Sequence, residues 1–242
     1  MPNNHLNIAI IGASGSLGGE FVKQLAAEES VSSVFAFSRS KTDFSNDKIA
    51  SHFLDIEDET SIQNAATIIS KDVKFDMVIV ATGMLHDHDI KPEKSIRDLS
   101  KNKFQQLFNI NTIAPAMIVK HFMPKLNRER QAVFAVISAR VGSISDNKLG
   151  GWYAYRASKA ALNMILKNAS IEIKRSNKNA IIIGLHPGTV DSNLSKPFQS
   201  AVSTQKLFTA EYSVQKMLDV VKDLTPLDSG NVVDFKGIKI EF

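Results

Sequence analysis

Cysteine is absent from this chain of 242 residues. That absence excludes disulfides, thiol catalysis and metal sites built on thiolates. No run of five like charges occurs, and 29 basic residues nearly balance 25 acidic ones, so nothing suggests a surface for nucleic acid. The longest apolar runs, such as residues 77–81, are far shorter than the roughly 18 residues of a membrane helix. We therefore expect neither nucleic acid nor a membrane as a partner.

The composition that remains is that of a globular protein. Hydrophobic residues make up 43% of the chain and charged residues 22%. No linker, internal repeat or low-complexity stretch divides the sequence, so we expect residues 1–242 to form a single domain. The first residues, MPNNHLNIAIIG, lack the positive region of a secretory signal. This pattern favours a cytoplasmic protein.

Short apolar runs alternate with amphipathic segments along the chain. Strands are predicted at Asn7–Ile11, Val34–Ser38, His52–Leu54, Met77–Ala81, Ala132–Ser138 and Ile181–His186, with a last strand pair around Gly237 within Asn231–Phe242. Helices are predicted at Leu17–Glu28, Thr60–Ser70, Phe104–Leu126, Tyr153–Lys174 and Ala210–Leu224. Apolar strands joined by long helical connections indicate an α/β fold, with a doubly wound, mostly parallel sheet and helices on both faces.

A glycine-rich turn follows the first predicted strand. Gly12, Gly15 and Gly18 recur every third residue, and a helix is predicted to begin beside them. Such glycines let the backbone approach a pyrophosphate, while the helix presents free N–H groups to the anion. A tight strand–helix turn without a ligand would use the same residues. The position after the first strand favours binding of a dinucleotide.

The end of the second strand carries basic residues where many NAD sites carry an acid. No Asp or Glu lies between Val31 and Thr42, whereas Arg39 and Lys41 are positively charged. An acid about 20 residues after the glycines would bind the ribose 2′-hydroxyl of NAD, and an Arg suits a 2′-phosphate. We therefore expect NADP(H) to be preferred, with NAD(H) possible. The alternative is an ordinary solvated arginine.

Two tyrosines precede a lysine by one helical turn, namely Tyr155 with Lys159 and Tyr212 with Lys216. A cation near a phenol favours the phenolate and lowers the pKa of the tyrosine toward the pH at which acid–base catalysis works best. The first pair opens a long helix after a strand that ends in Ser138, whereas no polar strand end precedes the second pair. We interpret the second pair as a solvated helix face.

Taken together, these motifs resemble the short-chain dehydrogenase/reductase family, whose fold is of the Rossmann type. The glycine loop, Asn111, Ser138, Tyr155 and Lys159 occur in family order across essentially the whole chain. The segments 138–159 and 186–190 are most similar to a C-factor-like branch. Two departures are visible: Ala81-Thr82-Gly83 stands where mainstream members have Asn-Asn-Ala-Gly, and Ser16 occupies a usual glycine position.

The resemblance implies a role for each matching residue. Tyr155 would exchange a proton with the substrate oxygen, Lys159 would lower the pKa of Tyr155 and hold the nicotinamide ribose, Ser138 would bind the carbonyl oxygen, and Asn111 would anchor a water next to Lys159. The cofactor-binding residues would be Gly12, Ser14, Gly15, Ser16, Leu17, Gly18, Ser38, Arg39, Ser40, Asp55, Ile56, Ala81, Thr82, Gly83, Tyr155, Lys159, Pro187, Gly188, Thr189 and Val190.

The resulting hypothesis is an NADP-dependent oxidoreductase acting on a small carbonyl compound or secondary alcohol. Two alternatives stay open: a regulator that binds NADP without turnover, and a C-factor-like signalling protein. His86 and His88 alternate in a polar loop, but no third ligand is evident, so no metal site is expected. The apolar stripe of Phe104–Lys125 is compatible with core packing or with a homodimer or homotetramer interface. The segment that ends in Trp152 is expected to form part of the substrate wall.

Overall fold

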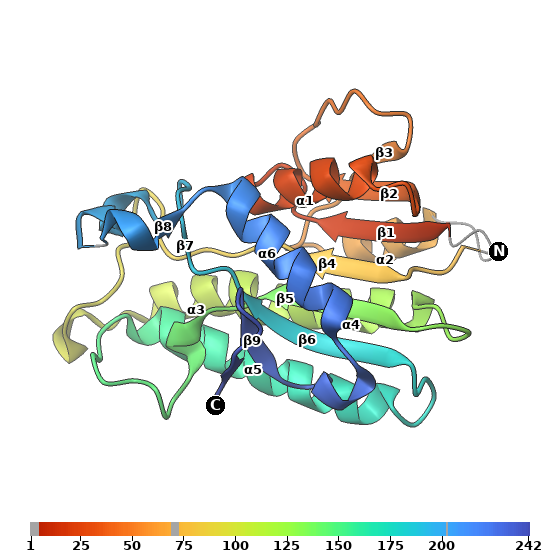
Figure 1. Ribbon diagram of the computed structural model, residues 1–242. Coiled ribbons are helices and arrows are strands. Elements are labelled where there is room, and N and C mark those ends of the chain that lie inside the picture. The colour runs from red at the N-terminus through yellow and green to blue at the C-terminus, as the bar shows by residue number, and fades with distance from the viewer. Residues whose placement is uncertain (1–4, 69–72, 202) are drawn as a thin grey trace.

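The computed structural model describes residues 5–68, 73–201 and 203–242. One eight-stranded sheet runs through it in the order β10-β9-β6-β5-β4-β1-β2-β3 (Figure 1). The strands are β1 (Leu6–Ile11), β2 (Val31–Ser38), β3 (Ile49–Phe53), β4 (Met77–Val80), β5 (Ala132–Ile137), β6 (Ala180–His186), β9 (Val232–Asp234) and β10 (Lys239–Ile240). All neighbours pair in parallel except β9 and β10, which form the predicted C-terminal pair with a turn at Gly237.

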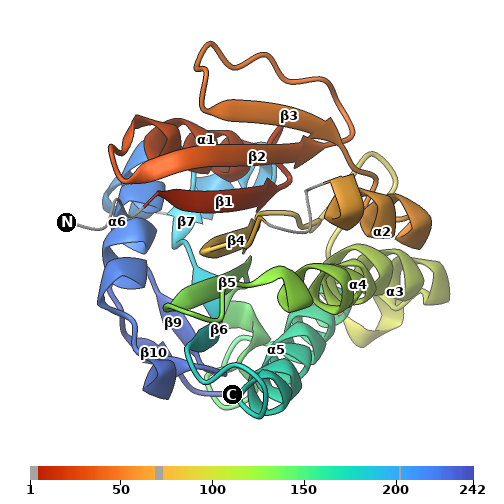
Figure 2. The ribbon, with the colours of Figure 1, turned by 90° about the vertical axis from the view of Figure 1, so that its right-hand side faces the viewer.

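Helices cover both faces of this sheet. They are α1 (Ser16–Ala27), α2 (Glu59–Ile68), α3 (Lys101–Phe108), α4 (Ala114–Phe122), α5 (Tyr153–Ile173) and α6 (Ala210–Asp223). Figure 2 shows α1 and α6 on one side of the sheet and α2, α3, α4 and α5 on the other. Two apolar cores result, one on each face, because successive side chains of every central strand point to opposite sides. The predicted doubly wound α/β fold is confirmed.

The predicted elements agree with the observed ones apart from their ends and one helix. Residues 69 and 70 of the predicted helix Thr60–Ser70 lie outside the described residues. The prediction of one helix over Phe104–Leu126 is wrong: α3 and α4 are separated by a π-helical turn at Asn109–Ile113, and a 3₁₀ turn follows at Met123–Lys125. A π-helical turn adds one residue to a turn of the helix. Hydrophobic periodicity does not reveal this insertion, because the apolar stripe continues on both sides of it.

The order of the strands determines where a ligand can bind. The chain moves outward from β1 to β2 and β3, then returns to β4 on the other side of β1. At such a switch point the loops that leave the carboxyl ends of β1 and β4 diverge and open a crevice. A separate pair of short strands, β7 (Thr189–Val190) and β8 (Leu207–Phe208), lies beyond the carboxyl end of β6, on the side of the sheet where the carboxyl ends of β1 and β4 also lie (Figure 1).

Candidate functional site

The glycine loop after β1 has the geometry of a phosphate site. Gly12 has a φ of 90°, and a Cβ atom at Gly18 would lie 2.0 Å from the Gly12 carbonyl oxygen. Helix α1 begins at Ser16, and its N-cap residue Gly15 provides no side-chain hydrogen bond to the first N–H groups. Ser14, Gly15 and Ser16 are exposed. The free N–H groups and the positive end of the helix dipole are therefore available to an anion.

A cavity of about 350 Å³ lies beside this loop. Its lining includes the predicted residues Gly12, Ser14, Gly15, Ser38, Arg39, Ser40, Ile56, Ala81, Thr82 and Gly83. Asp55 is not among the residues that line it; its carboxylate accepts a hydrogen bond from the N–H of Glu57. Glu57, which the sequence analysis missed, lines the cavity, and its carboxylate lies 3.6 Å from the Arg39 guanidinium. The basic end of β2 is thus partly neutralised by an acid from the loop after β3.

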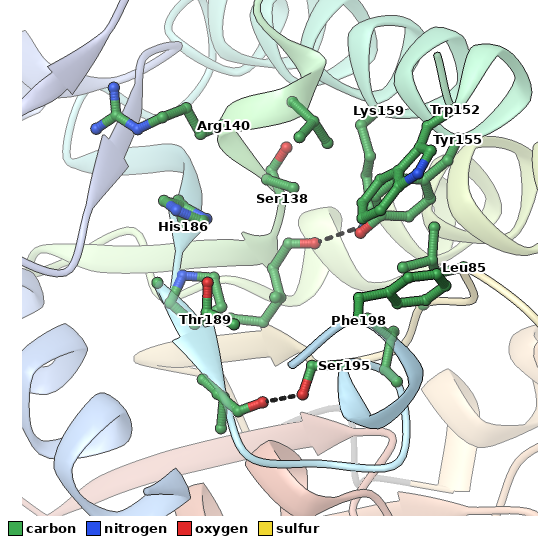
Figure 3. A pocket seen from close by; sticks show the side chains of 18 of the residues that line it. Leu85, Ser138, Arg140, Trp152, Tyr155, Lys159, His186, Thr189, Ser195 and Phe198 are labelled. Carbon is green, nitrogen blue, oxygen red and sulfur yellow. Dashed lines mark hydrogen bonds between the residues drawn. The ribbon is translucent and has the colours of Figure 1, made fainter. Parts of the chain in front are cut away.

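A second cavity, of about 760 Å³, contains the three residues predicted to act on the substrate (Figure 3). Ser138 follows β5, while Tyr155 and Lys159 lie in the first two turns of α5. The Lys159 ammonium donates a hydrogen bond to the Ile137 carbonyl at 3.0 Å and lies 5.9 Å from the centre of the Tyr155 ring. The Ser138 hydroxyl donates to Asn163 Oδ1 at 2.7 Å.

The two cavities share one wall, because Ala81, Thr82 and Gly83 line both. Leu17 of α1 reaches the larger cavity, whose other side is formed by Pro187, Gly188, Thr189 and Val190. Gly188 has a φ of 76°, and a Cβ there would lie 2.8 Å from the Phe208 ring, so a side chain at this position would collide with β8. All of the predicted cofactor residues except Ser16, Gly18 and Asp55 therefore line one or the other of these two adjoining cavities.

Asn111 lies in the π-helical turn, and a Cβ atom at Gly83 of the shared wall would lie 3.5 Å from its side-chain oxygen. It is fully buried, and its amide accepts a hydrogen bond from the Met84 N–H at 2.8 Å and donates one to the Met84 carbonyl at 2.7 Å. The same amide also donates to the Ser158 hydroxyl. Asn111 thus fixes the loop after β4 next to α5, a role that its sequence position did not indicate.

Burial dominates the electrostatics of the pair on α5. It raises the pKa of the Tyr155 phenol well above its ordinary value of 10, which is the direction opposite to the one predicted. Burial also lowers the pKa of Lys159 to about 8. Both shifts have the same origin, since each side chain is almost completely removed from water and its charged form loses solvation. In the protein alone, the phenol is protonated at neutral pH.

The aromatic side chains of Trp152 and Phe198 form one wall of the larger cavity (Figure 3). The Trp152 ring centre lies 5.0 Å from that of Phe198 and 6.2 Å from that of Tyr155. Outside the cavity lining, His86 packs against the edge of Phe198 at 5.5 Å. Leu85 adds an aliphatic surface. The prediction that Trp152 would contribute to this wall agrees with its position. Phe198 carries no motif that sequence analysis could have used.

Other sequence features have structural roles. His86 Nε2 lies 3.1 Å from the Leu194 carbonyl, and His88 faces Asp89 in solvent. Among residues 5–68, 73–201 and 203–242, no group of three or more His, Asp or Glu side chains is arranged to hold a metal ion. Tyr212 is exposed on α6, where its ring packs against Phe208. No helix in the described part of the chain is both long and apolar enough to cross a membrane.

Comparison with known proteins agrees with this geometry. The short chain dehydrogenase family pattern matches residues 6–203. The chain belongs to the short-chain dehydrogenase family. It is 30% identical over 190 residues to the 1-hydroxy-2-glutathionyl-2-methyl-3-butene dehydrogenase of Rhodococcus sp. (strain AD45), covering 78% of each chain. These findings confirm the prediction of an oxidoreductase enzyme of this family.

Two further similarities concern the branch and the fold. The chain is 30% identical over 146 residues to the C-signal protein of Myxococcus xanthus, covering 60% of this chain and 82% of that one. This supports the predicted similarity to the C-factor-like branch. The NADPH-bound carbonyl reductase from chicken fatty liver superposes with a TM-score of 0.85 at 24% identity, covering 99% of this chain and 95% of that one. The Rossmann-type fold is thereby confirmed.

Proposed function

We propose that this protein is an NADPH-dependent carbonyl reductase with Tyr155 as its general acid. One observation carries the proposal: Ser138, Tyr155 and Lys159 line a cavity that shares a wall with the glycine-loop cavity. A cofactor bound along the crevice would bring its reactive ring to these three side chains. The carbonyl reductase with the similar fold binds NADPH, which supports the same cofactor here.

The residues along the crevice fit a dinucleotide. A side chain at Gly12 would collide with Thr82, and one at Gly18 would collide with the Gly12 carbonyl, so the tight turn that leads to the α1 N-terminus depends on these glycines. Arg39 is 63% exposed, and its guanidinium can bind a 2′-phosphate with two N–H donors. When bound, NADPH supplies the hydride that reduces the carbonyl carbon. NAD(H) would lack the group that Arg39 recognises.

The protein's own side chains would donate the proton and stabilise the developing negative charge. A tyrosine that burial keeps protonated is a ready donor to the carbonyl oxygen as the oxygen gains charge. Lys159, held by the Ile137 carbonyl, is close enough to stabilise the tyrosinate that remains. The Ser138 hydroxyl, which donates to Asn163 Oδ1 in the protein alone, would turn to donate to the same substrate oxygen. A phenol that is protonated at neutral pH is in the state that a general acid in carbonyl reduction requires.

The shape of the larger cavity suggests which carbonyl compounds it accepts. Trp152, Phe198 and Leu85 present an apolar surface beside the phenol, and the volume of about 760 Å³ would hold both the reactive ring of the cofactor and a substrate beside it. We therefore propose small-molecule ketones and aldehydes that carry an aryl or bulky apolar group. The proposal includes a single domain over residues 1–242, a homo-oligomeric assembly and action in the cytoplasm.

A panel of aryl ketones, aryl aldehydes and small aliphatic aldehydes, assayed with NADPH and with NADH at pH 7, tests this function. Oxidation of NADPH with the aryl members, at higher kcat/KM than with the aliphatic ones, is the expected result. Failure to turn over any member, despite tight binding of NADPH, would contradict the enzymatic proposal.

The similarity to C-signal favours a second candidate function, a signalling protein that uses the bound cofactor. This candidate predicts that NADPH binds, that Tyr155→Phe leaves the cellular phenotype unchanged, and that a protein partner is captured only in the presence of cofactor. A pull-down performed with and without NADPH distinguishes it from the reductase.

A further inference from the structure

Glu93 is a buried acid that none of the proposed catalytic steps uses. It lies in the loop after β4 and is 1% exposed. Its Oε2 accepts a hydrogen bond from the Ala154 N–H at 3.3 Å, whereas Oε1 is buried without a hydrogen-bond partner. Leaving a buried oxygen unpaired costs stability, so this position calls for a reason beyond packing.

The turn that Glu93 contacts has an unusual backbone. Gly150 and Gly151 each have a φ of 64°, and Trp152 follows with a φ of 51°. Within the described part of the chain, Trp152 is the only residue other than glycine with a positive φ. A bulky side chain is strained in this left-handed conformation, which persists only where the surroundings hold it.

Glu93 holds this turn through two hydrogen bonds. Its main-chain carbonyl accepts from the Trp152 N–H at 2.6 Å, and its carboxyl group accepts from Ala154, two residues further on. Trp152 is the N-cap residue of α5 and offers no side-chain acceptor to the first N–H groups of the helix. The carboxyl group of Glu93 therefore replaces the missing N-cap side chain from a distant loop.

The consequence of this arrangement lies in the larger cavity. The indole of Trp152 faces Phe198 and Tyr155, so its direction depends on the left-handed turn. We propose that Glu93 is a positioning residue: it fixes Trp152 and thereby sets the wall against which the apolar part of the substrate lies. The part of this inference that concerns the substrate rests on the proposed carbonyl reductase function. The part that concerns Trp152 does not.

The chain provides its own probe, because Trp152 is its single tryptophan. Glu93→Leu removes the side-chain acceptor for the Ala154 N–H and keeps a similar volume, whereas Glu93→Gln keeps an acceptor oxygen. Glu172→Gln is the control, because Glu172 is an exposed acid on α5, the helix that Trp152 caps. We expect the emission of Glu93→Leu to shift to longer wavelength and to become more accessible to acrylamide. Its KM for an aryl ketone should rise about tenfold, which corresponds to the free energy of one lost helix cap. The kcat and the Kd of NADPH should each change by less than about twofold. Glu93→Gln and Glu172→Gln should stay close to the wild type.

Three outcomes would overturn the inference. The first is a Glu93→Leu protein that melts earlier but keeps the wild-type emission and KM, since Glu93 would then contribute to stability alone. The second is a Glu93→Gln protein as impaired as Glu93→Leu. If Glu93→Leu does not fold, Glu93→Asp takes its place, because its shorter carboxylate no longer reaches Ala154. The third outcome is a Glu93→Asp protein with the emission and KM of the wild type. Should the wild type reduce no carbonyl compound, the proposed function fails, but emission and acrylamide quenching still decide the role of Glu93.

Discussion

The two cavities of the crevice are built in different ways. The smaller one lies around the glycine loop and the ends of β2 and β3, and its lining includes the exposed polar residues Ser14, Arg39 and Ser40. The larger one has the buried side chains of Tyr155 and Lys159 and aromatic rings from separate loops in its lining. Main-chain recognition suits a ligand part that never changes, such as a pyrophosphate. Chemistry instead requires side chains whose protonation the surroundings control.

The largest difference between the cavities should appear on removing the Tyr155 hydroxyl. Tyr155→Phe should lower kcat by about a thousandfold, since the proton donor is lost, while the Kd of NADPH measured by fluorescence changes little. Tyr212→Phe is the matched control, because Tyr212 also precedes a lysine by one turn but lies exposed on α6. Turnover retained in Tyr155→Phe would assign the proton transfer to another group.

The smaller cavity should lose NADPH binding when the main chain of the glycine loop is displaced. Gly18→Ala places a methyl group 2.0 Å from the Gly12 carbonyl, so the loop must move; we expect a loss of about 3 kcal/mol in the free energy of unfolding and a large loss of NADPH binding. Gly19→Ala is the control, since its methyl group would lie 3.2 Å from the Ala13 carbonyl. Denaturant unfolding and NADPH titration of both variants measure the effects. Equal stability of the two variants would contradict this account of the loop.

The burial of Lys159 in the larger cavity should lower the stability of the folded protein. Burial lowers the folded-state pKa of Lys159 to about 8 from an ordinary value of 10.5, so the unfolded chain binds more protons between these pH values. Without cofactor at pH 7, Lys159→Met should therefore be more stable than the wild type by about 2 kcal/mol. This advantage should shrink as the pH rises from 8 toward 10, because the wild type then gains stability.

Unfolding in denaturant at pH 7, 8 and 9.5 measures this trend. Lys167→Met, in the same helix, is the control and should have no such dependence on pH, because the Lys167 side chain is partly exposed and lies outside the larger cavity. A stability advantage of Lys159→Met that stayed constant with pH would show that the buried charge is not its cause.

The smallest effects should concern the choice of cofactor. Arg39→Ala should weaken NADPH binding about tenfold and leave NADH binding unchanged, since only NADPH carries the 2′-phosphate. Glu57→Gln should strengthen NADPH binding about threefold, because an exposed carboxylate 3.6 Å from Arg39 competes with the phosphate for the guanidinium. Titration of both cofactors measures the ratio. Tighter binding of NADH than of NADPH by the wild type would overturn the assignment of Arg39.

The fold and the main-chain half of the site could be predicted from the sequence. Strand and helix periodicity, the glycine spacing and the Tyr155–Lys159 turn are local patterns, and local patterns are what a sequence records directly. The direction of the pKa shift of Tyr155 could not be predicted, because it depends on how completely the surrounding loops bury the phenol. Glu57 and Glu93 were missed for a related reason: each acts on a residue far away in sequence, and neither belongs to a motif.

The amide of Asn111 has a consequence for the wall that the two cavities share. It bonds both the N–H and the C=O of Met84, which follows directly after the shared residues Ala81, Thr82 and Gly83. A side-chain amide offers both donor and acceptor groups, as a peptide group does, so it satisfies both main-chain groups of Met84 at once. A substitution of Asn111 would therefore act on both cavities, because it would release the main chain next to the wall that they have in common.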